Sequence, residues 1–310
     1  MNWGSSRKNW PKMKNEKIWK DGRLIGWDEC KIHALSYSLH YGVAAFEGIR
    51  FYDTPRGIGL FRLRDHIKRL LNSAREFCMK VKYSNEELVD ATKRIVRESK
   101  KQTGYVRAII FYGSTKLLVH DEDNEVNIVI ALLPWGKYLK HDSIKIMSSS
   151  YMRQHPKSVP MNAKIAGYYV NSVLAVREAR KKGYDEALML DFKGNVAEGS
   201  AENFFIVKEK RLATPPLGNI LPGITRDSVI EIARDNGMKI EERKFSLDYA
   251  KNADEAFVTG TGAEITPVIQ IDKKIIGDGN VGPATKKLMK LYQDAVSGKI
   301  KKYEKWLDYA

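Results

Sequence analysis

The sequence has little cysteine and no long apolar run. Two cysteines, Cys30 and Cys78, occur in 310 residues, and their spacing fits neither a disulfide framework nor a zinc site. No apolar run approaches the length of a membrane span, and charges with Pro11 interrupt the first residues where a secretory signal would be apolar. These absences predict a cytoplasmic protein with no metal and no membrane partner, whose chemistry comes from other side chains.

Positive charge, by contrast, is abundant. Lys and Arg number 53 against 38 Asp and Glu, a net charge of +15, so nucleic-acid binding is the hypothesis from a different class. The basic residues gather in KMKNEKIWK near the start and KIKKYEKW near the end, without the aromatic-and-basic motif of an RNA-binding fold or the spacing of a zinc finger. A solvated basic surface that attracts anionic substrates explains the charge more economically, and no nucleic-acid partner is predicted.

Apolar periodicity predicts a mixed α/β chain of two domains. Residues 1–138 form a small N-terminal domain with a basic N-terminal extension, 139–145 a linker, and 146–310 a larger domain. In the first domain, FEGIRFYDTPRGIGLFRL predicts a hairpin, RDHIKRLLNSAREFCM a helix, and the capping box of Ser84 and Glu87 a second helix. YVRAIIFYG and NEVNIVIALLPW follow as strands.

The larger domain alternates short strands with helices. GYYVNSVLAVREARKKG predicts a helix that ends at Gly183. We expect its apolar residues Val170, Val173, Leu174 and Val176 to face largely inward. TRDSVIEIARDNG predicts another helix with Thr225 as its N-cap, and DEAFVTGTG a strand that enters a glycine loop.

Lys164 stands apart from the other lysines because its neighbours in VPMNAKIAGYYVNS are small or apolar. Removing an ammonium from water is costly and lowers its pKa, so a lysine in such company needs a reason. The structural alternative is a side chain that lays its stem along an apolar surface and keeps its charge in water.

Three further segments of the same half bear on Lys164. NVAEGSAENFF places Glu198 and Glu202 around small residues, ILPGITRDSV leads into a helix start, and VTGTGAEITP ends a strand at Thr261. Singly, each is typical of an ordinary turn. Together they supply an imine-forming amine, an acid for a ring nitrogen and backbone suited to a phosphate, which is what pyridoxal phosphate requires.

Several long motifs occur in register from about Tyr41 to Val268: HYGVAAFEGIR, YVR, PWGKY, AKIAGYY, AEGSAENFF, LPGITRD and TGTGAEITPV. The chain resembles the branched-chain amino acid aminotransferases, which are fold-type IV pyridoxal phosphate enzymes. The resemblance implies a smaller N-terminal α/β domain and a larger β-barrel-like domain with helices. It implies reversible ping-pong amino transfer between L-leucine, L-isoleucine or L-valine and 2-oxoglutarate, as in branched-chain amino acid biosynthesis.

Matching motifs also imply the cofactor residues. Lys164 matches the lysine that forms the imine with pyridoxal phosphate, and Glu198 the acid that faces the pyridine nitrogen. Tyr169 matches the tyrosine that hydrogen-bonds the phenolic oxygen, and Glu202 is left as a structural residue. The implied phosphate binders are Arg69, Ile224, Thr225 and Thr261.

The implied substrate residues come mostly from the first domain. They are Tyr41, Phe46, Gly48, Arg50, Tyr105, Arg107, Trp135 and Tyr138, together with the backbone of Thr261 and Gly262. Tyr105 and Arg107 are two apart in a predicted strand and so point the same way, and in the family such a pair helps to hold substrate carboxylates.

The loop STKLLVHDEDNEV departs from the bacterial pattern of the family. In the family this loop reaches the neighbouring subunit's substrate pocket, which implies a homo-oligomer, at least a dimer, with a hexamer as the larger alternative. Leu117, Leu118 and Val119 would then be apolar contributions to the partner's pocket.

Two alternatives share the fold: a D-amino acid aminotransferase and an aminodeoxychorismate lyase. FEGIR, YVR and PWGKY favour the branched-chain enzyme because they form the substrate side of the pocket. The ranking among leucine, isoleucine and valine does not follow from the sequence.

Overall fold

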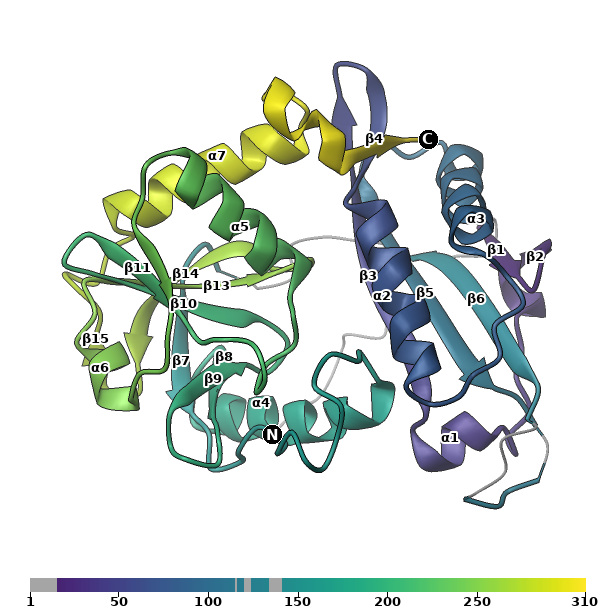
Figure 1. The fold of residues 1–310 in the computed structure, drawn as a ribbon, viewed down its shortest axis with the longest axis horizontal. Coiled ribbons are helices and arrows are strands. Elements are labelled where there is room, and N and C mark those ends of the chain that lie inside the picture. The colour runs from purple at the N-terminus through teal and green to yellow at the C-terminus, as the bar shows by residue number, and fades with distance from the viewer. Residues whose placement is uncertain (1–15, 115, 120–123, 134–140) are drawn as a thin grey trace. The chain divides into compact units, whose positions relative to one another are not determined.

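A computed structural model of the chain describes residues 16–114, 116–119, 124–133 and 141–310. The chain forms two compact units, Met1–Gly136 with Lys305–Ala310, and Lys137–Glu304. The sequence-based division places residues 305–310 in the second domain. The structure instead returns them to the first unit, because strand β16 (Leu307–Tyr309) pairs with strand β4 (Gly57–Phe61) (Figure 1).

The first unit is built on an antiparallel sheet of seven strands in the order β16-β4-β3-β5-β6-β1-β2. Its other strands are β1 (Lys17–Lys20), β2 (Arg23–Gly26), β3 (Ala44–Thr54), β5 (Gly104–Tyr112) and β6 (Val126–Leu133). The predicted hairpin is confirmed, since β3 pairs with β4 and Thr54 lies opposite Gly57. Short helical segments η2 (Trp27–Glu29) and α1 (Tyr37–Tyr41) precede β3.

Two helices of the first unit form where the sequence predicts them. Helix α2 (Leu63–Arg75) packs on β3, and its periodic residues Ile67, Leu70 and Ala74 are fully buried. Helix α3 (Asn85–Ser99) begins with the predicted capping box, in which the backbone N–H of Glu87 donates to the Ser84 hydroxyl and the Ser84 N–H to the Glu87 carboxylate.

The second unit contains a sheet that closes on itself. Strands β10, β13, β14, β7, β8 and β9 follow one another, and β9 returns to β10 through the pair Asn203 and Glu198. The bounds are β7 (Ile144–Ser148), β8 (Glu186–Leu190), β9 (Val196–Gly199), β10 (Asn203–Lys208), β13 (Glu255–Gly260) and β14 (Glu264–Ile271). This ring confirms the barrel-like larger domain. Strands β11 (Arg211–Thr214) and β12 (Ile240–Glu242) extend the sheet beyond β10, and β15 (Lys274–Ile275) pairs with β14.

Apolar side chains fill the second unit's core from the strands inward. Ile144, Leu188, Phe204 and Val258 are almost completely buried in one cluster. Ile144 and Lys145 belong to β7 rather than to the predicted linker 139–145, whose residues 139 and 140 lie outside the described part of the chain. Segment η3 (Ala166–Tyr168) and helices α4 (Tyr169–Lys181), α5 (Ile224–Asp235), α6 (Leu247–Lys251), α7 (Pro283–Val296) and η4 (Lys301–Trp306) complete this half.

Helix α4 corrects one sequence prediction. Val170, Val173 and Leu174 are 63%, 42% and 42% exposed, and Val176 is half-buried. The buried face instead carries Ala175 and Ala179, which pack with Met147, Ala187 and Met189 of the sheet. Small residues let the helix approach the strands closely, so the larger apolar residues are left on the outer face.

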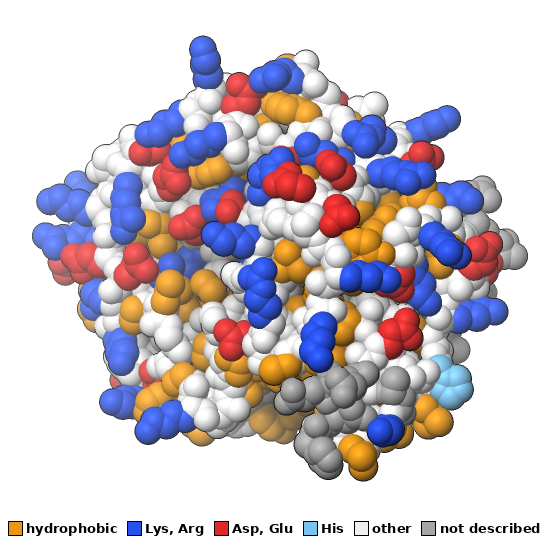
Figure 2. Space-filling view, turned by 45° about the vertical axis from the view of Figure 1, so that its right-hand side comes forward, with side chains coloured by type: hydrophobic (Ala, Val, Ile, Leu, Met, Phe, Trp, Pro, Cys, Tyr) orange, Lys and Arg blue, Asp and Glu red, His pale blue; other side chains and the backbone are white. Residues whose placement is uncertain are grey.

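Basic side chains do not gather in one patch on the face that Figure 2 shows. Lys and Arg are dispersed over this face and stand among Asp and Glu. The net positive charge is therefore distributed, as the solvated-surface interpretation expects of this face.

Candidate functional site

Lys164 and Tyr169 meet at the start of helix α4. The Lys164 Nζ donates to the Tyr169 hydroxyl at 2.5 Å and lies 4.9 Å from the centre of its ring. Ala163 and Ile165, on either side of the lysine, are 2% and 1% exposed, while Lys164 itself is only half-buried. The apolar neighbours therefore fix the backbone, and the short η3 turn brings the phenol back to the amine.

Glu198 lies on β9 and is 5% exposed. Its Oε1 is 2.6 Å from the Arg153 Nε, its Oε2 accepts from the Asn203 Nδ2 at 3.0 Å, and the Leu221 N–H donates to it at 3.2 Å. Burial raises the pKa of Glu198, while Arg153, the Leu221 N–H and Lys164 act in the opposite direction. A buried carboxyl group is thus held in a fixed orientation near the lysine.

The start of helix α5 is tied to the same carboxyl group. The Asn203 Nδ2 that donates to Glu198 also donates to the Leu221 carbonyl at 3.0 Å. A Cβ at Gly223 would stand 1.9 Å from the Asn203 Oδ1, so a glycine is required where the chain passes this amide. One asparagine therefore fixes the acid and the loop that leads into the helix.

Helix α5 begins at Ile224 with Gly223 as its N-cap and with no side-chain cap. The predicted N-cap, Thr225, is wrong: it lies in the first turn and is 3% exposed. The first N–H groups of a helix carry partial positive charge and bind anions when no side chain caps them. This helix start therefore suits a phosphate group.

Thr261 and Gly262 lie in the turn between β13 and β14. The turn leaves the barrel beside Asn203, which pairs with Thr259 of β13. The Thr259 hydroxyl is buried and has no hydrogen-bond partner among the described residues. The second unit therefore places this turn, Glu198 and the start of α5 around adjoining strands.

The candidate substrate residues of the first unit lie on adjacent strands. Opposite one another stand Gly48 of β3 and Arg107 of β5, and likewise Arg50 and Tyr105. A Cβ at Gly48 would lie 1.6 Å from the Tyr105 hydroxyl, so only glycine lets the phenol cross the strand.

Tyr105 and Arg107 point the same way, as predicted, because the Arg107 Nη2 donates to the Tyr105 hydroxyl at 3.4 Å. The guanidinium also lies 4.9 Å over the ring of Phe46. A permanently charged donor is thus held on an aromatic surface.

Arg69, a predicted phosphate binder, lies on α2 in the first unit. Its Nε and Nη2 donate to the two carboxylate oxygens of Glu47 at 2.6 and 3.0 Å, and the His66 Nδ1 is 2.7 Å from the same carboxylate. Burial alone would raise the pKa of Glu47, but Arg69 and His66 hold it below its ordinary value. Ile224, Thr225 and Thr261 lie in the second unit with Lys164.

The remaining predicted residues lie around helix α1 or outside the described residues. The Tyr41 hydroxyl donates to the Leu117 carbonyl at 2.9 Å, and the Tyr37 hydroxyl to the Val119 carbonyl at 2.9 Å. Leu118 and Val119 are 50% and 77% exposed. Trp135 and Tyr138 lie outside the described residues.

Sequence reasoning missed two residues of the site. Arg153 follows a strand and gives no local sign that it meets an acid 45 residues later. Asn203 gave a weak signal, since it is a polar residue at the head of the apolar strand NFFIVK. Both depend on pairings between segments that only the closed sheet brings together.

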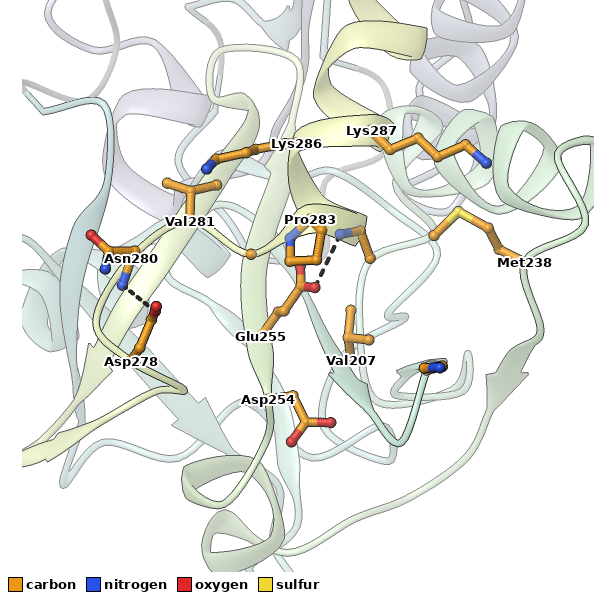
Figure 3. Close-up of a pocket in the computed structure, with 13 residues that line it drawn as sticks. Val207, Met238, Asp254, Glu255, Asp278, Asn280, Val281, Pro283, Lys286 and Lys287 are labelled. Carbon is orange, nitrogen blue, oxygen red and sulfur yellow. Dashed lines mark hydrogen bonds between the residues drawn. The ribbon is translucent and has the colours of Figure 1, made fainter.

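A separate cavity of about 1030 Å³ lies at the start of α7 (Figure 3). Glu255 accepts from the Ala284 and Thr285 N–H groups there, at 3.0 and 2.7 Å. This helix start is therefore already occupied by a carboxylate of the protein, and no predicted site residue lines the cavity.

Within the described ranges, no group of three His, Cys, Asp or Glu residues is arranged to hold a metal ion. None of the helices in this part of the chain combines the length and apolarity that a membrane crossing requires.

The residues of the second unit fit pyridoxal phosphate. The donor set contains an amine beside a phenol, a buried carboxyl group and an uncapped helix start, which match the aldehyde, phenolic oxygen, pyridine nitrogen and phosphate of the cofactor. Gly223, whose Cβ would collide with Asn203, is the backbone approach that such a phosphate site needs.

Comparison with known proteins gives a consistent result. The model of the amino-transferase class IV family matches residues 44–271. A branched-chain-amino-acid aminotransferase of Pseudomonas aeruginosa is 43% identical over 93% of this chain and 95% of its own length.

Two solved structures share the fold and are also branched-chain amino acid aminotransferases. One, from T.th. (strain HB 8), complexed with N-(5'-phosphopyridoxyl)-L-glutamate, has a TM-score of 0.92 and 41% identity and covers 96% of this chain and 99% of its own. The other, from Thermoproteus uzoniensis with norvaline, has a TM-score of 0.91 and 42% identity, with coverages of 94% and 98%.

Proposed function

The chain belongs to the amino-transferase class IV family, and from this premise we propose that it exchanges amino groups between branched-chain L-amino acids and 2-oxoglutarate with pyridoxal phosphate as cofactor. The observation that carries the proposal is the contact of the Lys164 amine with Tyr169 in the unit that also holds buried Glu198. The test is an assay of the purified protein with 2-oxoglutarate and either L-leucine or D-alanine. Turnover of D-alanine alone would favour the D-amino acid enzyme, and release of pyruvate from aminodeoxychorismate the lyase.

The proposed roles follow from the geometry of the second unit. When bound, pyridoxal phosphate supplies an imine-forming aldehyde and a ring that accepts electrons. Lys164 binds it covalently, and its Nζ then moves the substrate's α-proton as general base and acid. Tyr169 hydrogen-bonds the phenolic oxygen, Glu198 holds a proton at the pyridine nitrogen, and the N–H groups at Ile224 and Thr225 bind the phosphate.

The two substrate classes make opposite demands on the pocket. A branched-chain amino acid presents an apolar side chain, whereas glutamate presents a second carboxylate. We assign the recognition of that carboxylate to Arg107, whose charge is held between Tyr105 and Phe46. The aromatic faces beside it suit an apolar side chain.

Arg107→Met is expected to harm the two half-reactions unequally. Glutamate and 2-oxoglutarate lose a charge-assisted hydrogen bond, worth roughly 1.5–3 kcal/mol, and leucine loses less because its side chain offers the guanidinium nothing. Single-turnover rates, followed by the change in cofactor absorbance over a range of substrate concentrations, measure both losses. Arg97→Met, on the exposed side of α3, is the control. Equal losses for leucine and glutamate would remove the proposed division of labour.

We further propose that the chain is at least a dimer. Val170, Val173 and Leu174 form with Met152 an exposed apolar patch, the α4 patch, and the Asn171 side chain donates to the Met152 carbonyl at 2.9 Å. Large exposed apolar patches mark association sites. The location in the cytoplasm and the contribution of Leu117, Leu118 and Val119 to a partner's pocket stay predictions from the sequence.

Leu174→Asp with Val173→Asp is expected to shift the protein toward the monomer, because a buried unpaired carboxylate opposes association. Light scattering after size-exclusion chromatography gives the mass. Leu217→Asp, at a residue 55% exposed outside the α4 patch, is the matched control. An unchanged mass for the double variant would place the interface elsewhere.

A further inference from the structure

Two acids of the second unit are buried near the proposed site without a role in it. Glu186 of β8 and Glu202 of the turn between β9 and β10 are 2% and 3% exposed. The Glu202 Oε2 accepts from the Ala201 N–H at 3.1 Å, while its Oε1 is buried with no hydrogen-bond partner among the described residues. An ionised carboxylate with an unsatisfied buried oxygen is unfavourable, because nothing replaces the lost water.

The space around Glu202 is closed by backbone. A Cβ at Gly199 would lie 2.8 Å from the Glu202 Oε2, and one at Gly260 would lie 3.6 Å from its Cγ. The Gly199 N–H donates to the Glu202 carbonyl at 2.7 Å. The two glycines leave room for the carboxyl group between neighbouring strands, directly before the turn that carries Thr261.

The charges that face this acid are mostly negative. Burial, followed by the charge of Glu186, raises the pKa of Glu202 well above its ordinary value; Glu198 adds to this, and the Ala201 N–H and Lys164 oppose it. Burial also raises the pKa of Glu186, against the Ser200 and Ala187 hydrogen bonds and the charge of Arg180.

The other two acids have different partners. Glu198 has Arg153 at 2.6 Å, whereas Arg180, the cation acting on Glu186, lies on the exposed side of α4. Three ionised carboxylates in this cluster would therefore exceed the nearby buried positive charge, and Glu202 is the one with the fewest donors.

We propose that Glu202 is a neutral carboxylic acid at physiological pH, paired electrostatically with Glu186, and that it acts as a positioning residue that leaves Glu198 as the ionised acid of the cluster. An ionised Glu202 would place a second negative charge near Lys164 and would compete with Glu198 for it. The inference rests on the proposed function for its consequence in catalysis, but the protonation state can be measured without any turnover.

Infrared spectroscopy of the purified protein, with carbonyl-labelled glutamate and with and without added pyridoxal phosphate, tests the protonation state. We expect a band of a protonated carboxylic acid at neutral pH that is lost in Glu202→Gln and kept in Glu209→Gln, at an exposed glutamate. In Glu186→Gln the band should disappear at lower pH than in the wild type, because the neighbouring charge is gone. A wild type without the band, a band that survives Glu202→Gln, or an unshifted titration in Glu186→Gln would overturn the proposal.

The pH dependence of stability gives an independent readout. Since folding raises the pKa of Glu202, the unfolded chain loses this proton first, and the free energy of unfolding falls as pH rises from the ordinary glutamate value to the raised one. Glu202→Gln should lack this fall and should retain kcat within about threefold, because the amide copies a neutral acid in shape and charge. A loss of kcat as large as that of Glu198→Gln would overturn the positioning role. Should the protein fail to transaminate leucine, the infrared and stability results still decide the protonation state.

Discussion

Lys164→Ala is expected to abolish amino transfer while leaving the fold intact. General acid–base catalysis alone contributes about 10²–10⁴-fold, and the covalent attachment of the cofactor is lost as well. The amine is half-buried and its printed contacts are with Tyr169, whereas the neighbouring Ala163 and Ile165 hold the backbone in the core, so little packing changes. The steady-state rate with L-leucine and 2-oxoglutarate measures the loss.

Borohydride reduction followed by peptide mass spectrometry should place the cofactor on Lys164 in the wild type and nowhere in Lys164→Ala. Lys157→Ala, at an exposed lysine of the same segment, should remain active and labelled. A protein that takes up no pyridoxal phosphate, or a Lys164→Ala variant with normal turnover, would contradict the assignment.

Glu198→Gln is expected to lower the rate of proton abstraction by about 10²-fold, the scale for removal of one preorganised electrostatic partner. The carboxylate favours a proton on the facing ring nitrogen by charge attraction, which is strong where water is excluded. Gln keeps the shape of the side chain but not the charge. The single-turnover loss of the α-proton, followed with deuterated leucine, isolates this step.

Two controls separate electrostatics from folding in this variant. Glu209→Gln, on the surface, should have no effect, and thermal unfolding of Glu198→Gln reports the cost of its altered contacts with Arg153 and Asn203. A normal rate in Glu198→Gln together with a crippled Glu202→Gln would show that Glu202 is the acid that serves the cofactor.

Local patterns predicted the features that depend on few residues. The capping box of Ser84 and Glu87 and the shared direction of Tyr105 and Arg107 appear as expected, because neighbouring residues alone decide them. The lysine stood out for a similar reason, since its flanking Ala163 and Ile165 are core residues.

Features set by distant pairings could not be predicted from local patterns. Arg153 meets Glu198 because β7, β8 and β9 are neighbours in the ring, and no local pattern contains that information. The apolar stripe of α4 was read as inward because helices usually bury such residues. Here Ala175 and Ala179 face the sheet instead, and periodicity does not distinguish a core from a surface meant for a partner.

The return of β16 to the first unit affects how the chain folds as it leaves the ribosome. Residues 307–309 complete the sheet beside β4 (Figure 1), yet the entire second unit is synthesised between these two strands. At roughly 5–20 residues per second, β4 waits on the order of ten seconds or more with an open edge, which is a template for mispairing with other chains. The nascent first unit therefore depends on its last strand to close that edge, and a stalled or shortened translation product would expose it.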